Sequence, residues 1–162
     1  MTIYLLRHGI AETAGAGVDD AARALTDEGR KKLRALLKLA RGAGVKPERI
    51  LTSPLVRAVQ TAELAGEVLS CETPPMRTEV LAGGSPEDVW SEIRAHKDAG
   101  SLLLAGHEPQ FSQLAAYLLA APELVVDFKK GALVAIEMEQ FGPHPRGALR
   151  WMLVPKLAKT AP

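Results

Sequence analysis

Residues 2–9 read Thr-Ile-Tyr-Leu-Leu-Arg-His-Gly, and this stretch predicts how the rest of the chain is arranged. A short apolar run rich in β-formers is typical of a buried strand, and Gly9 lets the backbone turn sharply where the run ends. Arg7 and His8 are therefore expected at the carboxyl edge of a strand, where open α/β sheets bind their ligands. A guanidinium offers N–H donors to phosphate, and an imidazole can be a nucleophile, a base or a metal ligand. We interpret the pair as an anion site with a reactive group in it.

An Arg-His pair after a strand is more often an ordinary surface pair, so this interpretation depends on what else reaches the same edge. Arg57 lies about one helical turn after Pro54, near the start of a helix expected to begin at Ser53, where backbone N–H groups favour an anion. His107 directly follows an apolar run at 101–106. Two guanidiniums and two imidazoles that converge on one point are suited to hold and attack a phosphoryl group.

Apolar runs alternate with amphipathic helical patterns along the whole chain. Strands are expected at 2–6, 49–52, 72–76 (a weaker edge strand), 101–106, 132–139 and 148–154, the last two as an antiparallel hairpin. Helices are expected from an N-cap at Thr26 to 42–44, from an N-cap at Ser53 to about 69, from a capping box at Ser85 to 95, and at 109–121. This order predicts a three-layer α/β/α sandwich with a mostly parallel central sheet and an antiparallel edge. Residues 10–24 are expected to form a loop over the edge of the first strand, where substrate contacts are plausible, and the tail from Lys156 is expected to fray.

Composition narrows the class of protein. The chain has 162 residues, 47% of them hydrophobic and 24% charged, which is typical of one soluble globular domain spanning 1–162. A net charge of +1 gives no basis for a nucleic-acid partner, and Pro122 and Glu123 interrupt the longest apolar region, so no membrane span is expected. Cys71 is the only cysteine and there is no basic, apolar leader pattern, so a cytoplasmic protein is expected.

Four motifs follow one another in an order that resembles the histidine phosphatase superfamily, which includes the phosphoglycerate mutases and acid phosphatases. They are Leu-Arg-His-Gly at 6–9, Leu-Thr-Asp-Glu-Gly-Arg at 25–30, Thr-Ser-Pro-Leu-Val-Arg-Ala-Val-Gln-Thr-Ala at 52–62 and Gly-His-Glu-Pro at 106–109. The short chain and Leu-Ala-Gly-Gly-Ser-Pro-Glu-Asp at 81–88 look most like the SixA-type phosphohistidine phosphatases of that superfamily. The resemblance implies a phosphoglycerate mutase-like fold.

The resemblance also implies a two-step hydrolysis that needs neither a metal ion nor a cofactor. His8 would attack phosphorus through one ring nitrogen and form a phosphohistidine, which water would then hydrolyse. The other ring nitrogen needs an acceptor that fixes the tautomer, most simply a backbone carbonyl. Arg7, Arg57 and His107 would hold the phosphoryl oxygens, and a protonated His107 would do so best. The implied substrate is phosphohistidine on a protein, such as a phosphotransfer domain, or a small phospho-compound.

The general acid is the least defined part of the expected site. Glu79 is the candidate, because acids of the superfamily follow the third strand, although a solvated loop residue is the simpler interpretation of it. Glu12, Asp19 and Asp20 are further candidates in the first loop. Imidazole leaves phosphorus more readily than an alkoxide does, so a phosphohistidine phosphatase needs little help from an acid. The alternatives are a small phosphomonoesterase, a mutase, and a phosphate-binding module without turnover.

Overall fold

The strand that ends in Arg7 lies near the middle of a six-stranded sheet. The computed structural model describes residues 1–15, 17 and 19–158. The strand order is β3-β2-β4-β1-β5-β6, in which the first four strands run parallel and β5 and β6 form the antiparallel edge. The strands are β1 (Thr2–Arg7), β2 (Arg49–Thr52), β3 (Met76–Arg77), β4 (Ser101–Gly106), β5 (Leu133–Glu137) and β6 (Ala148–Leu153). The mostly parallel sheet with an antiparallel hairpin is as predicted.

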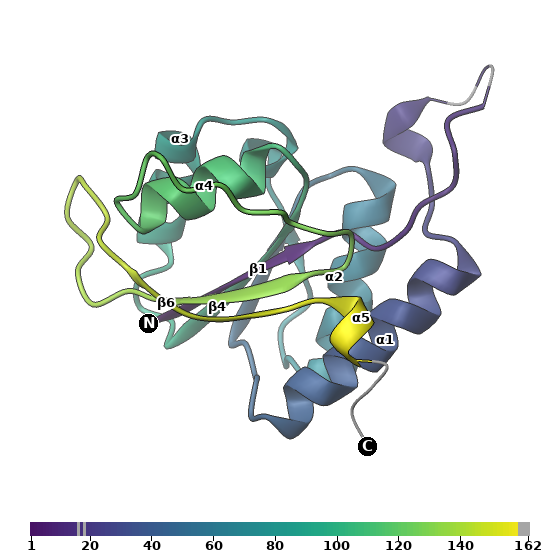
Figure 1. The fold of residues 1–162 in the computed structure, drawn as a ribbon, viewed down its shortest axis with the longest axis horizontal. Helices are drawn as coiled ribbons and strands as arrows, with labels where there is room; N and C mark the ends of the chain where they lie inside the picture. The colour runs from purple at the N-terminus through teal and green to yellow at the C-terminus, as the bar shows by residue number, and fades with distance from the viewer. Residues whose placement is uncertain (16, 18, 159–162) are drawn as a thin grey trace.

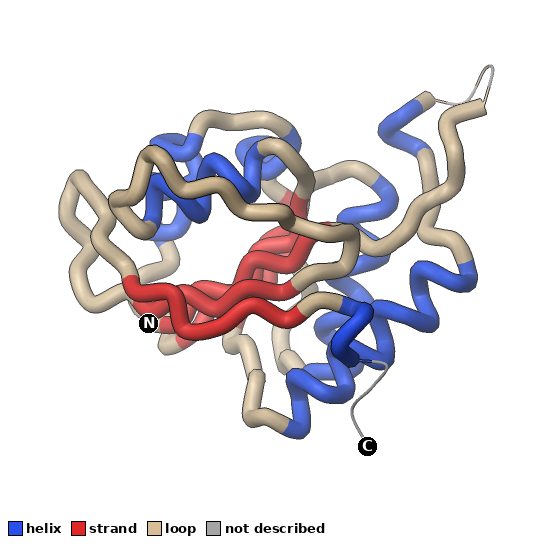
Figure 2. The backbone as a smooth tube through the Cα atoms, in the orientation of Figure 1, coloured by secondary structure: helices blue, strands red, loops and turns tan. Residues whose placement is uncertain are grey.

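Helices cover both faces of this sheet and complete the expected three layers (Figure 1). Figure 2 shows the strands in red between two groups of blue helices. Helices α3 (Pro86–Ala95) and α4 (Gln110–Leu118) lie on one face, and α1 (Asp27–Gly42), α2 (Val56–Leu69) and the short α5 (Pro155–Ala158) lie on the other.

Strand β1 is buried on both faces, which explains its unbroken apolar sequence. Ile3 and Leu5 belong to the apolar core under α3 and α4, whereas Tyr4 and Leu6 belong to the core under α1 and α2. Ile3, Leu5 and Leu6 are fully buried, and each such side chain contributes about 1.5–3 kcal/mol. Both cores therefore hold β1, and with it the residues at its carboxyl end, in a fixed place.

Two of the predicted helix starts are confirmed by their caps. Thr26 Oγ1 accepts a hydrogen bond of 2.9 Å from the backbone N–H of Gly29 at the start of α1. At the start of α3, Ser85 Oγ accepts from the backbone of Asp88 and the Asp88 carboxylate accepts from the backbone of Ser85. These bonds satisfy N–H groups that have no partner inside the helix.

The predicted start of α2 is wrong. The helix begins at Val56 with Leu55 as its N-cap, so Ser53 is not the cap and Pro54 is not in the first turn. Ser53 is fully buried at the end of β2, where its backbone N–H donates to the carbonyl of Ala105 in the sheet. The burial of Ser53 and its hydrogen bond to the sheet therefore determine its role, and they outweigh the local preference of Ser-Pro for a helix start.

Three smaller boundaries also differ from the sequence-based expectation. Strand β3 covers Met76–Arg77 only, because the preceding prolines lack the N–H that a strand pair needs. Helix α4 ends at Leu118, and Ala120 just beyond it has a left-handed φ of 51°. Residues 156–158 form part of α5 and do not fray, since Ala158 packs against the core under α1; the rest of the tail, 159–162, lies outside the described residues.

The segment between β1 and α1 extends away from the sheet, as the loop expected at 10–24 (Figure 1). An isolated antiparallel bridge between Ala11 and Leu25 closes its base, and a short 3-10 helix, η1 (Asp20–Ala22), lies within it. None of the helices in the described part of the chain is both long and apolar enough to cross a membrane.

Candidate active site

His8 lies at the carboxyl edge of the sheet, just past β1, and is only 6% exposed. Its Nδ1 lies 2.7 Å from the carbonyl oxygen of Gly9. A carbonyl oxygen can only accept a hydrogen bond, so Nδ1 carries the proton and Nε2 keeps its lone pair. The backbone carbonyl that the mechanism requires is therefore present, and it leaves Nε2 as the free nitrogen of the ring.

Two residues that the sequence did not single out hold the chain after His8 in place. The backbone N–H of Gly9 donates to Thr61 Oγ1 at 3.2 Å, and the buried Thr61 hydroxyl donates to the carbonyl of Arg57 at 2.7 Å. Gly29 of α1 packs so closely that a Cβ there would lie 2.1 Å from the carbonyl oxygen of Ile10. Both contacts fix the turn whose carbonyl sets the tautomer of His8.

The two predicted guanidiniums lie at the same edge. Arg57, in the first turn of α2, is 6% exposed and donates from Nη1 to the carbonyl of Asp20 at 2.7 Å and from Nη2 to its carboxylate at 3.0 Å. Arg7 donates from Nη1 to the carbonyl of Phe128 at 2.5 Å. Loop contacts thus use both outer nitrogens of Arg57 and one outer nitrogen of Arg7, and the two bonds of Arg57 orient its guanidinium.

His107 completes the group. Its ring centroid lies 5.2 Å from that of His8, with 53° between the two planes. Its Nε2 lies 2.7 Å from Ser53 Oγ. The structure therefore brings together His8, Arg57 and His107 from three separate segments of the chain, as the sequence predicted, with Arg7 adjacent to His8.

Unsatisfied polar atoms are concentrated in this group. In the described part of the chain, four buried side-chain nitrogen or oxygen atoms lack a hydrogen-bond partner, and three of them are Arg7 Nε, Arg57 Nε and His107 Nδ1. Buried polar groups are normally hydrogen-bonded, so three orphaned nitrogens around a neutral imidazole need an explanation. A tetrahedral oxyanion would supply oxygen acceptors to all of them.

Both histidines are uncharged at neutral pH. Burial, with smaller contributions from His107, Arg57 and Arg7, lowers the pKa of His8 to about 3 despite its bond to Gly9. Burial and then the charge of Arg57 lower the pKa of His107 to about 4. His8 Nε2 is therefore unprotonated at neutral pH. The protonated form of His107, which would hold phosphoryl oxygens best, is disfavoured here because burial and two nearby guanidiniums oppose a further positive charge.

These pKa values predict an acid-sensitive stability. Between about pH 6.5 and about pH 4 the unfolded chain binds protons at both histidines that the folded chain does not, so the free energy of unfolding falls as the pH falls. Each histidine adds up to about 1.4 kcal/mol per pH unit to that fall. Urea unfolding across this range should give a shallower pH dependence for His107→Gln than for the unchanged protein; parallel curves would contradict the lowered pKa of His107.

The carboxylates proposed as a general acid lie in different environments. Glu79 is exposed at the first residue of the 3-10 helix η2 (Glu79–Ala82), separated by one residue from the end of β3. Asp20 is bound by both Arg23 and Arg57, which hold the pKa of its carboxyl below the usual range. It is therefore ionised at neutral pH, which argues against Asp20 as a proton donor. Asp19 accepts from the backbone N–H of Ala21, and Glu12 is exposed.

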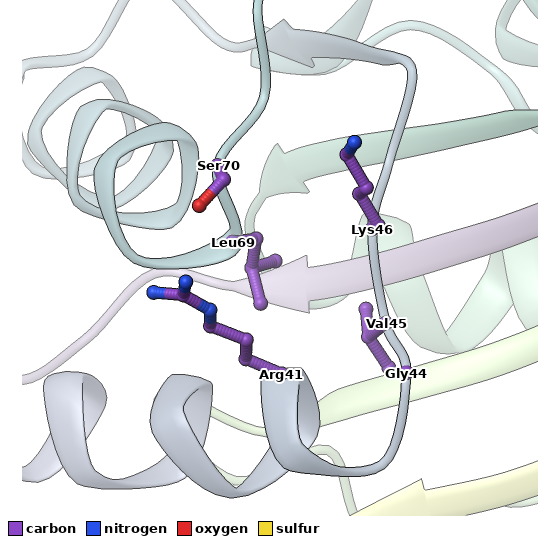
Figure 3. Close-up of a pocket in the computed structure, with 6 residues that line it drawn as sticks. All are labelled: Arg41, Gly44, Val45, Lys46, Leu69 and Ser70. Carbon is purple, nitrogen blue, oxygen red and sulfur yellow. The ribbon is translucent and has the colours of Figure 1, made fainter.

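A cavity of about 340 Å³ lies elsewhere, between the carboxyl ends of α1 and α2 (Figure 3). It is lined by Arg41, Gly44, Val45, Lys46, Leu69 and Ser70. Val45 and Lys46 precede β2, so this cavity lies at the amino edge of the parallel strands, opposite to His8. Within the described ranges, no three His, Cys, Asp or Glu side chains are grouped so that they could hold a metal ion.

The fold and this set of nitrogen donors define an α/β protein with a candidate anion site at the carboxyl edge of its sheet. Residues 3–82 match the family model of the Histidine phosphatase superfamily (branch 1). Phosphohistidine phosphatase SixA of Escherichia coli K12 is 29% identical, with 98% of this chain and 99% of that protein aligned. An uncharacterized protein of a Picosynechococcus species is 32% identical over 71% of each chain.

A solved structure of the protein histidine phosphatase SixA complexed with tungstate superposes with a TM-score of 0.86. It is 27% identical and covers 97% of this chain and 99% of its own. The chain belongs to the histidine phosphatase superfamily, and SixA proteins are among its relatives.

Proposed function

We propose that this chain is a phosphohistidine phosphatase that works through a covalent phosphohistidine on His8. The observation that supports this best is the bond from His8 Nδ1 to the Gly9 carbonyl, because it leaves the lone pair of Nε2 free beside three unpartnered nitrogens. A neutral, buried imidazole with one free lone pair is a competent nucleophile toward phosphorus.

In the first step, His8 Nε2 forms a bond to phosphorus while the bond from phosphorus to the substrate nitrogen breaks. A substrate imidazole that carries a proton on its other ring nitrogen leaves as neutral imidazole, so no separate acid is required. The ring of His8 becomes positively charged, and its Nδ1–H bond to Gly9 strengthens accordingly. In the second step water attacks phosphorus, the electron pair returns to Nε2, and the water proton passes to solvent.

Arg7, Arg57 and His107 hold the transferred group in this proposal. Their orphaned nitrogens can donate to the equatorial oxygens, where charge accumulates during an in-line transfer. The two guanidiniums supply the positive charge that metal ions supply in kinases, so the proposed reaction proceeds without a metal ion or cofactor.

The relatives support the proposed substrate. The Escherichia coli protein is named a phosphohistidine phosphatase, and the SixA structure carries tungstate. Tungstate, like phosphate, is a tetrahedral oxyanion, which is the shape of ligand that the four side chains of this chain suit. We therefore infer that the substrate is a phosphorylated protein that bears phosphohistidine, such as a phosphotransfer domain.

Phosphate release in EDTA tests the proposal. The substrates are a protein phosphorylated on histidine, a phosphoserine peptide and p-nitrophenyl phosphate. We expect preference for the phosphohistidine protein. Preference for the esters would instead indicate a small phosphomonoesterase, and binding of tungstate without turnover of any substrate would indicate a phosphate-binding module.

Replacing Glu79 tests whether the reaction uses an acid. Glu79→Gln should change turnover of phosphohistidine by less than about twofold, because imidazole leaves without help, and should matter only for phosphoserine, whose alkoxide needs a proton. Glu72→Gln, which alters another exposed carboxylate before β3, is the matched control. A loss of tenfold or more with phosphohistidine in Glu79→Gln alone would overturn the acid-free first step.

A further inference from the structure

We infer that Ser53 is a positioning residue that fixes the tautomer of His107. In that tautomer Nδ1 of His107 carries the proton and serves as a neutral donor to the phosphoryl group, a role that rests on the proposed function. The relevant geometry is a fully buried hydroxyl, Ser53 Oγ, 2.7 Å from His107 Nε2.

The sheet fixes the position of this hydroxyl. Ser53 directly follows β2, its backbone N–H donates to the carbonyl of Ala105 in β4, and His107 directly follows the end of β4. Adjacent parallel strands therefore place the serine and the histidine side by side at the same edge. Because α2 begins only at Val56, the hydroxyl is not used as a helix cap.

The proton of the Ser53 hydroxyl favours one direction of the bond. Ser53 Oγ already accepts a hydrogen bond from the backbone N–H of Leu55 at 3.3 Å. The hydroxyl has a single proton of its own to donate, and His107 Nε2 is the acceptor within reach. If Ser53 donates to Nε2, the proton of the neutral imidazole must lie on Nδ1.

The opposite assignment fits the site poorly. A proton on His107 Nε2 would leave the Ser53 hydroxyl proton with no acceptor among the described residues and would make Nδ1 a bare lone pair. That lone pair would share the site with the phosphoryl oxygens and repel them, whereas Nδ1–H attracts them. The neutral state of the ring at neutral pH, given its pKa of about 4, makes the choice of tautomer matter.

Nitrogen-15 NMR of the folded, histidine-labelled protein reads the tautomer directly. In the unchanged protein at neutral pH, we expect His107 Nδ1 to show the chemical shift of a protonated ring nitrogen and Nε2 that of an unprotonated one. Ser53→Ala should shift both signals toward the average of two exchanging tautomers. Thr52→Val is the matched control, because it removes another fully buried hydroxyl, which donates to the carbonyl of Ser53 and does not contact His107.

Turnover of the phosphohistidine protein gives the second readout. Ser53→Ala should lower kcat about tenfold with little change in KM, a smaller loss than removing a donor outright. Ser53→Thr, which restores a hydroxyl, should recover most of the activity and the original tautomer, and Thr52→Val should keep both.

Failure of this inference and failure of the proposed function give different results. The role of Ser53 would be overturned, even if phosphohistidine is hydrolysed, by either of two spectra. One is a proton on His107 Nε2 in the unchanged protein; the other is a set of His107 nitrogen-15 chemical shifts in Ser53→Ala that equals that of the unchanged protein. If no phospho-compound is hydrolysed, the proposed function fails, and the spectra alone then decide whether Ser53 sets the tautomer.

Discussion

Replacing His8 by alanine should abolish hydrolysis of phosphohistidine, with a loss of at least about 10⁴-fold in kcat, because the variant has no atom that can take up the phosphoryl group. The buried ring is uncharged, and among the described residues it is hydrogen-bonded through Nδ1 alone, so Nε2 is the group whose loss removes the reaction. Initial rates of phosphate release from the phosphohistidine protein measure the effect.

His96→Ala is the matched control for this variant. His96 is the C-cap of α3, and its ring lies 3.5 Å from the Glu92 carboxylate. It precedes β4 in the chain, so it lies at the amino edge of the sheet, away from His8. It should therefore retain the full rate of phosphate release. Substantial phosphate release by folded His8→Ala would rule out a covalent step on this residue.

Arg57→Ala should lower kcat by about 10² to 10³-fold, the usual loss when one donor to a developing charge is removed. The helix should still form, because the guanidinium of Arg57 is bonded to Asp20 and the apolar residues of both cores are other residues. Arg57→Lys should recover only part of the rate, since an ammonium cannot both hold Asp20 through two bonds and reach the phosphoryl oxygens.

Arg34→Ala is the corresponding control for Arg57. Arg34 is also a helix guanidinium paired with a carboxylate, Glu67, but both side chains of this pair are well exposed. Its removal should leave kcat unchanged and have little effect on stability, because exposed ion pairs are screened by solvent. If the two variants lost the same activity, or if Arg57→Ala were fully active, Arg57 would have no special role at the site.

The sequence was sufficient to predict the layers, and the place of Arg7, His8, Arg57 and His107 at one edge of the sheet, because both depend on local patterns. An apolar run that ends in Arg7 and His8 requires a buried strand whose end meets solvent, and a parallel sheet brings all such ends to one edge. The same logic applies to His107 after β4. The pattern of apolar residues within each segment contains this information without any knowledge of the neighbouring segments.

The contacts that refine the site could not be predicted in this way, because they join residues far apart in the chain. Asp20 reaches Arg57 from a loop with no regular pattern, and Ser53 reaches His107 from the end of the neighbouring strand. Ser-Pro at 53–54 is a common helix start, and only the packing of the sheet shows that Ser53 is used otherwise. The neutral state of His107 likewise depends on burial, which local sequence does not express.

Trapping of the phosphorylated enzyme tests the covalent step most directly. The protein is mixed with a phosphohistidine substrate labelled with ³²P, quenched in alkali within milliseconds, and mapped by mass spectrometry. We predict an alkali-stable, acid-labile label on Nε2 of His8, since Nδ1 is protonated and bound to Gly9. The label should be absent from His8→Ala. Rapid turnover with no label on the protein, or a label on any residue other than His8, would contradict a phosphohistidine intermediate at this site.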